Sequence, residues 1–417
     1  MYEIISHDYG SPRWTGEVTD CSMPMTFDTY SNCGFGCCYC FSQFQRAIGK
    51  TKVNYLAKKV KAVNVERIKN MFLHPDDTQF GPYIKQRKVM QWGGLSDPFC
   101  WIEKEHGVTL ELLKFFKDID YPLCFSTKGV WWLDDKRYTD LFRNQKNWNV
   151  KVSIITLDPQ KARYVEKGVV SPQERIEGLR KITELNCGGA TLRLRPFIIG
   201  VTNPTHIELI NQSARAGATA MTTEFFCLER RAVNSAKKNY KDITKACGFD
   251  IVDFYSKHSK GAGYLRLNRN IKEKFILEMK EAAEKNNMRF YVSDAHFKEL
   301  CNNGCCCGLP PDWNYSKGKF THALLLAKKN GTVKWSDISG ENLFLKDINF
   351  NKAAGFNTTS TKRRLKYGSC TLRDYLRSVW NDLKHAQNPY RYFGGILQPL
   401  ELDENNDIVY IYQKEKK

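Results

Sequence analysis

The sequence lacks the features of a membrane-spanning or secreted protein. Its 417 residues contain no apolar run long enough to cross a membrane, and the first ten, MYEIISHDYG, include no apolar targeting segment. Internal repeats and low-complexity tracts do not stand out, so the length predicts one large domain or two ordinary ones. Because nothing directs the chain to an oxidising compartment, its fifteen cysteines indicate metal binding in a reducing cytoplasm rather than disulfides.

Acidic residues are scarce relative to basic ones. The chain has 45 Asp and Glu against 64 Lys and Arg, a formal charge of +19, which attracts polyanions or acidic surfaces. Between residues 352 and 391, nine basic residues face two acids, and aromatic residues lie among them for stacking on bases or for ordinary packing. We predict that this segment binds nucleic acid, with a solvated basic face as the alternative, through Arg363, Arg364, Lys366, Arg373, Arg377 and Arg391.

The most informative stretch is Cys33-Gly34-Phe35-Gly36-Cys37-Cys38-Tyr39-Cys40. Its C-x3-C-x2-C spacing suits three corners of a cubane iron–sulfur cluster, which normally takes one thiolate per iron. A motif with three ligands either takes a distant fourth cysteine or leaves one iron open for chemistry. A structural zinc site is the alternative, although zinc would need a partner Cys/His pair at matching spacing. Cys38 is a spare thiol.

This spacing, with the aromatic Tyr39 before the last cysteine, resembles the signature of the radical S-adenosylmethionine (SAM) superfamily. The resemblance implies a 4Fe–4S cluster held by Cys33, Cys37 and Cys40, whose fourth iron is chelated by SAM. An electron, delivered by an external donor such as flavodoxin or ferredoxin, then cleaves SAM to a 5'-deoxyadenosyl radical that abstracts a substrate hydrogen.

The chain alternates between strand and helix patterns, which favours a parallel sheet. We predict strands at 23–29, 88–92, 123–126, 150–156, 191–199, 220–226 and 289–293, and helices at 103–117, 135–144, 172–185, 207–215 and 271–285. The helix after Ser171 is the clearest, because Pro172 and Glu174 complete its start signal. The fold class is α/β, and six or so units resemble the partial TIM-like (β/α)6 barrel of radical SAM enzymes.

From about residue 301 the pattern changes, which predicts two domains, 1–300 and 301–417. The second is a smaller α+β region that is rich in cysteine and basic residues. Asn330-Gly331 predicts a hairpin between strands at 324–327 and 332–335, followed by a helix at 371–385 and a strand at 408–413.

Candidate cofactor ligands follow the expected strands. Gly93 and Gly94 allow close approach of a ligand, and Ser96 or Asp97 can accept hydrogen bonds from the SAM ammonium group. A plain Asp-Pro turn is the alternative. Three further candidates, for the SAM carboxylate and ribose, are Lys128, Ser153 and Arg195; for Arg195, a protein carboxylate is an equally good partner.

The runs Val152-Ser153-Ile154-Ile155-Thr156-Leu157-Asp158 and Ser171-Pro172-Gln173-Glu174-Arg175, with Arg195-Pro196 and Ser96-Asp97-Pro98, resemble the spore photoproduct lyase-like branch of the superfamily. This resemblance covers about residues 15–300 and implies action on DNA, as in repair of a thymine photoproduct. One departure argues against dimer repair: Gly94 stands where the hydrogen-donating cysteine is expected. Cys100 lies nearby as a candidate donor, and a buried structural thiol is the alternative.

A second cysteine group, Cys301, Cys305, Cys306 and Cys307, lies just beyond the last expected strand. Three of these thiols, with Cys21 or Cys227, can bind an auxiliary iron–sulfur cluster; a zinc site or reduced thiols are the alternatives.

Three polar residues near expected strand ends are candidates for catalysis. Asp294 and His296 can bind substrate or transfer protons, and Glu224 can hydrogen-bond substrate or pair with Arg195.

These features predict a radical SAM enzyme that modifies or repairs a base, with DNA favoured over RNA, and no membrane partner. The enzyme-class alternative is a radical SAM maturase acting on a peptide, a protein or a small molecule. The non-enzymatic alternative is a nucleic-acid-binding protein whose cysteines hold structural metal.

Overall fold

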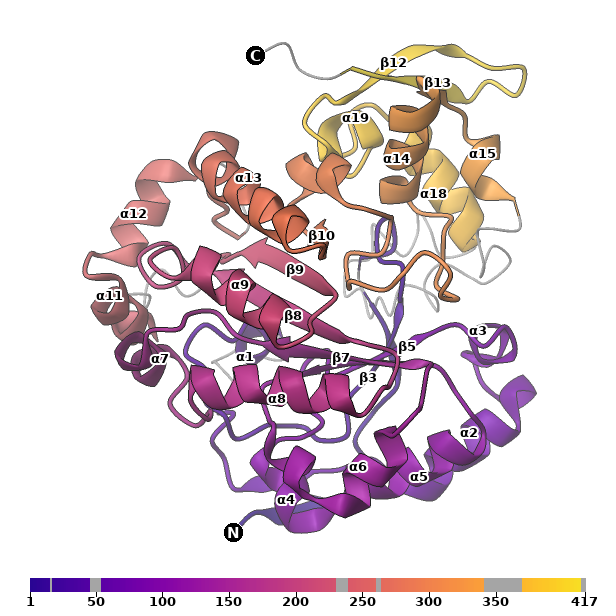
Figure 1. The fold of residues 1–417 in the computed structure, drawn as a ribbon. Helices are drawn as coiled ribbons and strands as arrows, with labels where there is room; N and C mark the ends of the chain where they lie inside the picture. Colours follow the sequence, from indigo (N-terminus) through magenta and orange to yellow (C-terminus); the bar gives the residue numbers. More distant parts are fainter. Residues whose placement is uncertain (16, 46–53, 230–238, 260–263, 341–369, 414–417) are drawn as a thin grey trace. The chain divides into compact units, whose positions relative to one another are not determined.

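The computed structural model describes residues 1–15, 17–45, 54–229, 239–259, 264–340 and 370–413 (Figure 1). They divide into two compact units that interleave along the sequence. The first unit comprises Met1–Ser11, Phe27–Glu66 and Trp92–Phe290, and the second comprises Pro12–Thr26, Arg67–Gln91 and Tyr291–Lys417. Among the described residues, no helix is both long and apolar enough to cross a membrane.

An eight-stranded sheet has the order β10-β9-β8-β7-β6-β5-β3-β2, and the described residues form no closed barrel. The neighbours β6 to β9 pair in parallel, and β2 pairs antiparallel with β3. Every residue of β6 and β7 is buried, as expected for parallel strands covered on both faces. The strands are β2 (Arg13–Trp14), β3 (Met25–Phe27), β5 (Met90–Trp92), β6 (Leu123–Thr127), β7 (Trp148–Ser153), β8 (Ala190–Phe197), β9 (Ala220–Phe225) and β10 (Arg289–Val292).

The predicted α/β class is confirmed, and each of the seven predicted strands is present. Helices alternate with the strands (Figure 1), and within the first unit α8 packs on β7 and β8 while α13 packs on β9. This unit also contains a small parallel sheet of β1 (Glu3–Ser6) and β4 (Lys59–Lys61). Its helices are α1 (Ser42–Gln45), α4 (Trp101–His106), α5 (Val108–Asp118), η2 (Trp131–Asp134), α6 (Lys136–Phe142), α7 (Pro159–Val165), α8 (Pro172–Glu184), α9 (His206–Arg215), α11 (Lys241–Cys247), α12 (Ile251–His258) and α13 (Arg269–Lys285).

Two helix starts show how local sequence determines these elements. The Ser171 hydroxyl accepts from the Glu174 backbone N–H at 3.2 Å, and the Glu174 carboxylate accepts from the Ser171 N–H at 2.9 Å, as predicted. The helix expected at 103–117 is instead two helices, α4 and α5. Gly107 separates them because it adopts a left-handed conformation at φ 71°.

Aromatic side chains form the core beneath β5, β6 and β7. Phe99 stacks on Trp132 with ring centroids 4.5 Å apart, and Phe142 contacts Trp148 at 4.9 Å. Trp92 stacks on Phe125 at 5.5 Å. This packing fixes the ends of the strands, from which the candidate site residues extend.

The second unit contains a three-stranded antiparallel sheet, β11-β13-β12. The hairpin predicted at Asn330-Gly331 is wrong: Asn330 is the last residue of a helix, and Gly331, at φ 89°, ends it. The same residue pair that favours a tight turn therefore serves as a helix end here. The elements are η1 (Pro75–Asp77), α3 (Gly81–Lys85), η4 (Ala295–Leu300), α14 (Phe320–Asn330), β11 (Thr332–Val333), α15 (Ser336–Ser339), α18 (Leu372–Asn381), α19 (Pro389–Tyr392), β12 (Leu397–Leu402) and β13 (Ile408–Tyr412); α2 (Val65–Leu73) spans the division between the units.

Candidate metal and cofactor site

The cysteine loop follows β3 in the first unit. Gly34 and Gly36 adopt positive φ angles of 71° and 62°, which a side chain would strain. The Cys37 carbonyl accepts hydrogen bonds from the Cys40 N–H at 3.2 Å and from the Gln43 amide at 3.0 Å. These contacts fold the chain back on itself between the second and third ligand candidates.

The three candidate thiols influence one another electrostatically. Burial raises the pKa of Cys33, and its neighbours Cys40, Cys100 and Cys37 raise it further. Burial also raises the pKa of Cys37 to about 12, against the opposing effect of Lys128. Iron binds thiolates, so metal binding here would release protons. The donor set and its grouping fit an iron–sulfur cluster.

In the described part of the chain, no group of three or more Cys, His, Asp or Glu side chains is placed to hold a single metal ion. A tetrahedral zinc ion with Zn–S bonds of about 2.3 Å needs sulfurs about 3.8 Å apart. A cluster takes one thiolate per iron, so its ligands stand farther apart. The thiols of the cysteine loop are thus not arranged around a single zinc ion in the part of the chain that the structure describes.

A buried ionic network lies beneath the cysteine loop. The Tyr39 hydroxyl donates to Glu166, whose other carboxylate oxygen accepts from Arg175 at 2.6 Å. Lys128 lies 3.5 Å from Glu166, and its ammonium group stands 5.5 Å from the Tyr39 ring. Burial opposes ionisation of Glu166, but Arg175 and Lys128 outweigh it and lower its pKa. The network fixes the aromatic residue of the cysteine motif.

Glu166 and Arg175 were not among the predicted site residues. Arg175 lies on α8 with 0% of its surface exposed, and its guanidinium also donates to the Ser153 carbonyl at 2.7 Å. A buried guanidinium needs an anionic partner. The one sequence signal was an arginine on the apolar side of an amphipathic helix; the identity of its partner depends on tertiary packing.

The loop after β5 is held by its own side chains. Ser96 donates its hydroxyl to the Tyr30 carbonyl at 2.7 Å. The Asp97 carboxylate accepts from the Thr127 hydroxyl, the Lys128 N–H and the Phe99 N–H at 2.7, 2.6 and 2.9 Å. Burial raises the pKa of Asp97 to about 6, opposed by these hydrogen bonds.

The two glycines of this loop, Gly93 and Gly94, are half-buried. A Cβ on Gly93 would lie 2.4 Å from the Ser126 carbonyl, so close packing on β6 already requires glycine there. Gly94 keeps its predicted place directly after Gly93, between β5 and the Ser96 turn. The half-buried backbone of both residues remains a candidate for SAM binding.

The candidates on β7, β8 and β9 form a second polar group. The Ser153 hydroxyl accepts from Arg193 at 3.3 Å, and Arg193 also donates to the Arg195 carbonyl at 3.4 Å. Arg195 forms an ion pair with Glu224. The carboxylate partner considered for Arg195 is thus present in the protein itself.

Cys100 is fully buried at the start of α4. Burial raises the pKa of its thiol, and Asp97 raises it further. Its environment fits the structural-thiol alternative better than a hydrogen donor to substrate.

The remaining candidates lie in the second unit or outside the described residues. Asp294 is the residue before η4, and the His296 ring packs close to Gly394. Exposed Arg373 and Arg377 lie on α18, where Arg377 pairs with Asp407 at 2.7 Å. Exposed Arg391 donates to the Leu383 carbonyl at 2.6 Å. Arg363, Arg364 and Lys366 lie outside the described residues.

Three aromatic residues of the basic segment pack internally. Trp380 is fully buried and donates to the Ile408 carbonyl at 2.7 Å, and Tyr375 and Phe393 are also buried. For these three rings the structure shows core packing, one of the two uses considered, whereas Tyr390 is exposed.

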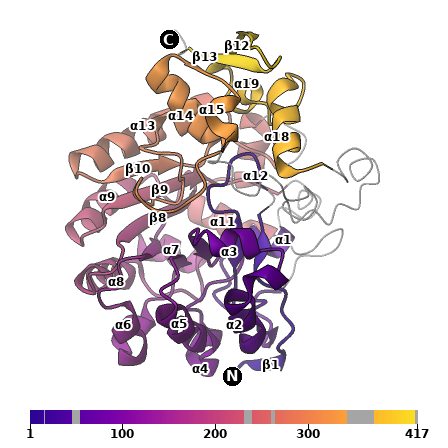
Figure 2. The same ribbon diagram turned by 90° about the vertical axis from the view of Figure 1, so that its right-hand side faces the viewer.

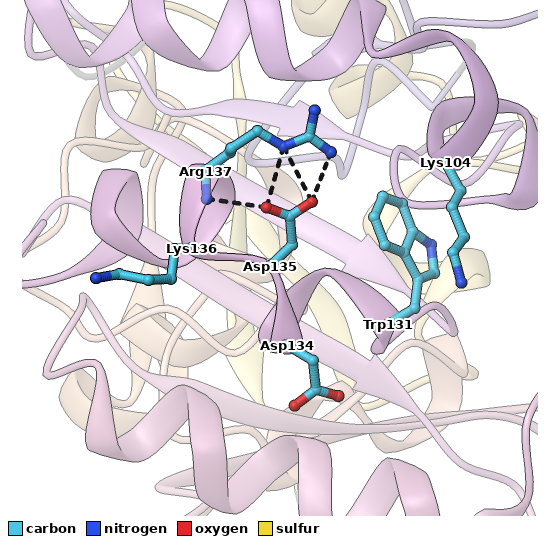
Figure 3. A pocket seen from close by; sticks show the side chains of 6 residues that line it. All are labelled: Lys104, Trp131, Asp134, Asp135, Lys136 and Arg137. Atoms are coloured by element: carbon cyan, nitrogen blue, oxygen red, sulfur yellow. Dashed lines mark hydrogen bonds and ion pairs between the residues drawn. The ribbon is translucent and has the colours of Figure 1, made fainter.

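Two clefts open on the first unit. The first, of about 430 Å³, is lined by Lys104, Trp131, Asp134, Asp135, Lys136 and Arg137. Figure 3 shows Asp135 and Arg137 pointing toward one another, with bonds down to 2.7 Å between them. Asp134 pairs with Lys181, so both acids of this cleft are engaged in ion pairs.

The second cleft, of about 810 Å³, lies between α7 and α11, which stand side by side (Figures 1 and 2). It is lined by Gln160, Arg163, Tyr164, Lys167, Asp242 and Lys245, and we call it the basic cleft. Three cations face one acid, and the Lys245 ammonium group lies 4.5 Å from the Tyr164 ring.

The basic cleft adjoins the cysteine loop. The residue after Tyr164, Val165, accepts through its carbonyl from the Cys38 N–H at 3.0 Å, and Gly168 donates to the Phe35 carbonyl at 3.0 Å. The segment that carries Tyr164 and Lys167 is therefore hydrogen-bonded to the cysteine loop.

The sheet is open and largely parallel, and the three-thiol loop follows β3. Two solved variants of spore photoproduct lyase, a cysteine-to-serine and a tyrosine-to-phenylalanine mutant, are similar at TM-scores of 0.51 and 0.50. In each, 16% of aligned residues are identical, and the match covers 69% of this chain and 80% of the lyase. The chain therefore has the fold of spore photoproduct lyase, which confirms the resemblance at the level of the fold.

SuiB from Streptococcus suis matches more weakly, with a TM-score of 0.41 and 12% identity over 68% of this chain and 52% of that protein. No protein-family model and no curated protein matches the sequence.

Proposed function

We propose that this protein is a radical SAM enzyme that modifies or repairs a nucleic-acid base, with DNA as the favoured substrate. The observation that carries the proposal is the loop of Cys33, Cys37 and Cys40 within a spore photoproduct lyase fold. These thiols would hold a 4Fe–4S cluster, which with bound SAM supplies a radical that abstracts hydrogen.

The buried network of Glu166, Arg175 and Lys128 supports the cysteine loop from below. Glu166, held by Arg175, fixes the Tyr39 ring and with it the turn that carries Cys37 and Cys40. Lys128 lies within electrostatic reach of both Cys37 and Glu166. It is therefore placed to contribute positive charge beside a carboxylate ligand such as that of SAM.

The basic cleft supports a polyanionic substrate. Arg163, Lys167 and Lys245 are exposed. Arg163 and Lys245 can exchange water for phosphate oxygens at little desolvation cost, whereas Lys167 would exchange its ion pair with Asp242, at 2.8 Å, for a phosphate. Tyr164 offers a ring face beside them, which suits stacking of a base. Because the segment that carries Tyr164 is hydrogen-bonded to the cysteine loop, we expect a strand to approach the loop from this side. A target base within a duplex would need to be flipped out, at a cost of a few kcal/mol that these contacts can offset.

The proposal includes three further components. An external one-electron donor such as flavodoxin or ferredoxin reduces the cluster, the protein acts in the reducing cytoplasm, and a second iron–sulfur centre forms at the cysteine group that begins with Cys301.

The proposal is tested by anaerobic reconstitution of the full chain with iron, sulfide, dithionite and SAM. We expect 5'-deoxyadenosine to form, and the triple variant Cys33→Ala, Cys37→Ala, Cys40→Ala to form none. Incubation with DNA and RNA, followed by mass analysis of the digested nucleosides, should show deuterium exchange or a new mass in a base. Absence of 5'-deoxyadenosine from the reconstituted wild type would contradict the enzymatic proposal, and unchanged nucleosides would contradict the substrate.

A further inference from the structure

The loop that follows β5 is hydrogen-bonded along its length to the end of β3 and the residue after it. The Gly93 N–H donates to the Phe27 carbonyl at 2.9 Å. The backbone N–H groups of Leu95 and Ser96 both donate to one oxygen of the Asp28 carboxylate, Oδ1, at 2.7 and 2.8 Å. All of these residues belong to the first unit. A single side-chain atom therefore fixes two consecutive peptide groups of the loop.

Asp28 is itself held in place. It directly follows Phe27, the last residue of β3, and its backbone N–H donates to the Ser11 hydroxyl at 2.9 Å. Asp28 is 0% exposed, and the two N–H groups that it accepts offset the cost of burying its carboxylate. A fully buried side chain does not reach a ligand, so Asp28 can act on the candidate site only through the loop that it holds.

The two bonds to Asp28 determine which way the loop directs its carbonyl oxygens. In a trans peptide group the N–H and the C=O point in opposite directions. The Leu95 N–H is turned toward Asp28, so the carbonyl of Gly94, which belongs to the same peptide group, points away from Asp28. The next carbonyl shows the same alternation, because Leu95 accepts through it from the Tyr55 hydroxyl at 3.3 Å.

The Ser96 hydroxyl is oriented by the same stretch of chain. It donates its hydrogen to the Tyr30 carbonyl at 2.7 Å, so its oxygen retains only the capacity to accept. Tyr30 is fully buried, and its own hydroxyl donates to Glu103 at 2.6 Å. Cys33, the first thiol of the cysteine loop, lies three residues further along the chain. The segment from Asp28 to Tyr30 therefore joins the loop after β5 to the cysteine loop.

These orientations suit a positively charged ligand. The loop turns two N–H groups inward and leaves the Gly94 carbonyl and the Ser96 hydroxyl oxygen as acceptors. We propose that Asp28 is a positioning residue for SAM binding, whose Oδ1 holds the loop so that these acceptors face the SAM ammonium group. The inference rests on the proposed function, because it takes SAM as the ligand. Without Asp28 the two N–H groups are free to turn outward, where their positive ends oppose an ammonium group.

Two variants separate the acceptor atom of Asp28 from its charge. Asp28→Ala removes Oδ1, whereas Asp28→Asn keeps one oxygen and removes the negative charge. Because both loop N–H groups bind the same oxygen, the single amide oxygen of asparagine can accept both. Thr29→Val is the matched control in the neighbouring residue. The Thr29 hydroxyl accepts from the Trp92 indole N–H at 3.1 Å and lies 2.8 Å from the Thr109 hydroxyl, so its contacts are with the core.

The first measurement is amide hydrogen exchange of the full chain before reconstitution, read from peptides that cover residues 93–97. We expect two amides of the Asp28→Ala variant to exchange about tenfold faster or more than in the wild type, while Asp28→Asn and Thr29→Val stay within about threefold. The wild type alone covers the case in which Asp28→Ala fails to fold. Its Leu95 and Ser96 amides should exchange at least about tenfold more slowly than in an unstructured peptide. Unprotected amides at these two positions would overturn the proposal.

The second measurement is the SAM concentration that half-saturates 5'-deoxyadenosine formation by the reconstituted protein. We expect Asp28→Ala to raise it about tenfold or more, the loss of one charge-assisted hydrogen bond, with a smaller change in rate at saturating SAM. Asp28→Asn should return it to within about threefold of the wild type. Thr29→Val should keep the wild-type value while losing stability to denaturant.

The outcomes separate this inference from the proposed function. An unchanged half-saturating SAM concentration in Asp28→Ala, an Asp28→Asn variant as weak as Asp28→Ala, or an equal loss in Thr29→Val would contradict the role of Asp28 while SAM cleavage by the wild type still supports the function. If hydrogen exchange responds as expected but the wild type forms no 5'-deoxyadenosine, Asp28 holds the loop as inferred, and the proposed function fails together with SAM as the ligand.

Discussion

The cysteine loop of the first unit and the cysteine group of the second unit obtain their thiols in different ways. The loop draws Cys33, Cys37 and Cys40 from eight consecutive residues and rests on the buried Glu166 network. The second group combines a short loop with Cys21, supplied by a distant segment. Three protein thiolates would leave one iron of a cubane open, and a fourth thiolate from a distant segment would close it. The comparison leads us to expect that the ligand number of each proposed site depends on whether tertiary packing adds a cysteine to the local motif.

The largest effect should come from removing one thiol of the cysteine loop, with removal of one thiol of the second group as its comparison. We expect Cys37→Ala to reduce 5'-deoxyadenosine formation to the assay background, because the reactive cluster loses a ligand. Cys306→Ala should retain SAM cleavage, because it affects only the proposed second iron–sulfur centre. Loss of uncoupled SAM cleavage in the Cys306→Ala variant, measured by chromatography, would show that the two centres are not distinct in role.

Removing the support of the cysteine loop should have the next largest effect. Glu166→Gln leaves Arg175 buried without a countercharge, which costs about 3 to 5 kcal/mol of unfolding free energy. Denaturant unfolding measures this, and Glu177→Gln, which removes an exposed partner of Arg180 on the same α8, serves as the control with no measurable loss. Similar stability of the two variants would mean that the network does not support the loop.

Removing positive charges from the basic cleft should have a smaller effect, on nucleic-acid binding. Changing Arg163, Lys167 and Lys245 to Gln should weaken nucleic-acid binding and lower the salt dependence, d log K/d log[salt], by about 2. Arg137→Gln, which changes a guanidinium already paired with Asp135 in the cleft of Figure 3, should leave both unchanged. Fluorescence anisotropy over a salt series measures both quantities. A triple variant of Arg363, Arg364 and Lys366 tests the basic segment in the same way, and an effect confined to that variant would move the binding surface away from the basic cleft.

The smallest effect should follow Cys100→Ala. Since Cys100 is fully buried, we expect SAM cleavage and product formation to be retained, with a small loss of stability. Uncoupling, in which 5'-deoxyadenosine accumulates without nucleic-acid product, would instead identify Cys100 as the hydrogen donor. Product analysis by mass spectrometry distinguishes the two.

Much of the fold can be predicted from local sequence, and the failures have physical causes. Strand 123–126 and the Ser171 capping box are encoded by neighbouring residues, and β6 and α8 appear where expected. Gly107 and Gly331 act as helix ends. The apolar spacing around Gly107 looks the same whether a helix tolerates this glycine or ends at it. Likewise, the dipeptide Asn330-Gly331 is compatible with both a hairpin turn and a helix end.

The residues of the candidate site also divide into those that local sequence predicts and those that depend on tertiary packing. The thiol spacing is local, so its ligands could be proposed from sequence. The partner of Arg195 was among the alternatives, because Glu224 is expected on the adjacent strand. Glu166 could not be found, since only packing of α7 and α8 against the cysteine loop explains a buried carboxylate there.

The central claim is that the cluster of the cysteine loop keeps one iron available to SAM. The most direct test is electron paramagnetic resonance of the reduced protein carrying Cys306→Ala and Cys307→Ala, with and without SAM. We predict a cubane signal whose g-values change on addition of SAM. A signal unaffected by SAM, or no iron–sulfur signal in this variant, would contradict the claim.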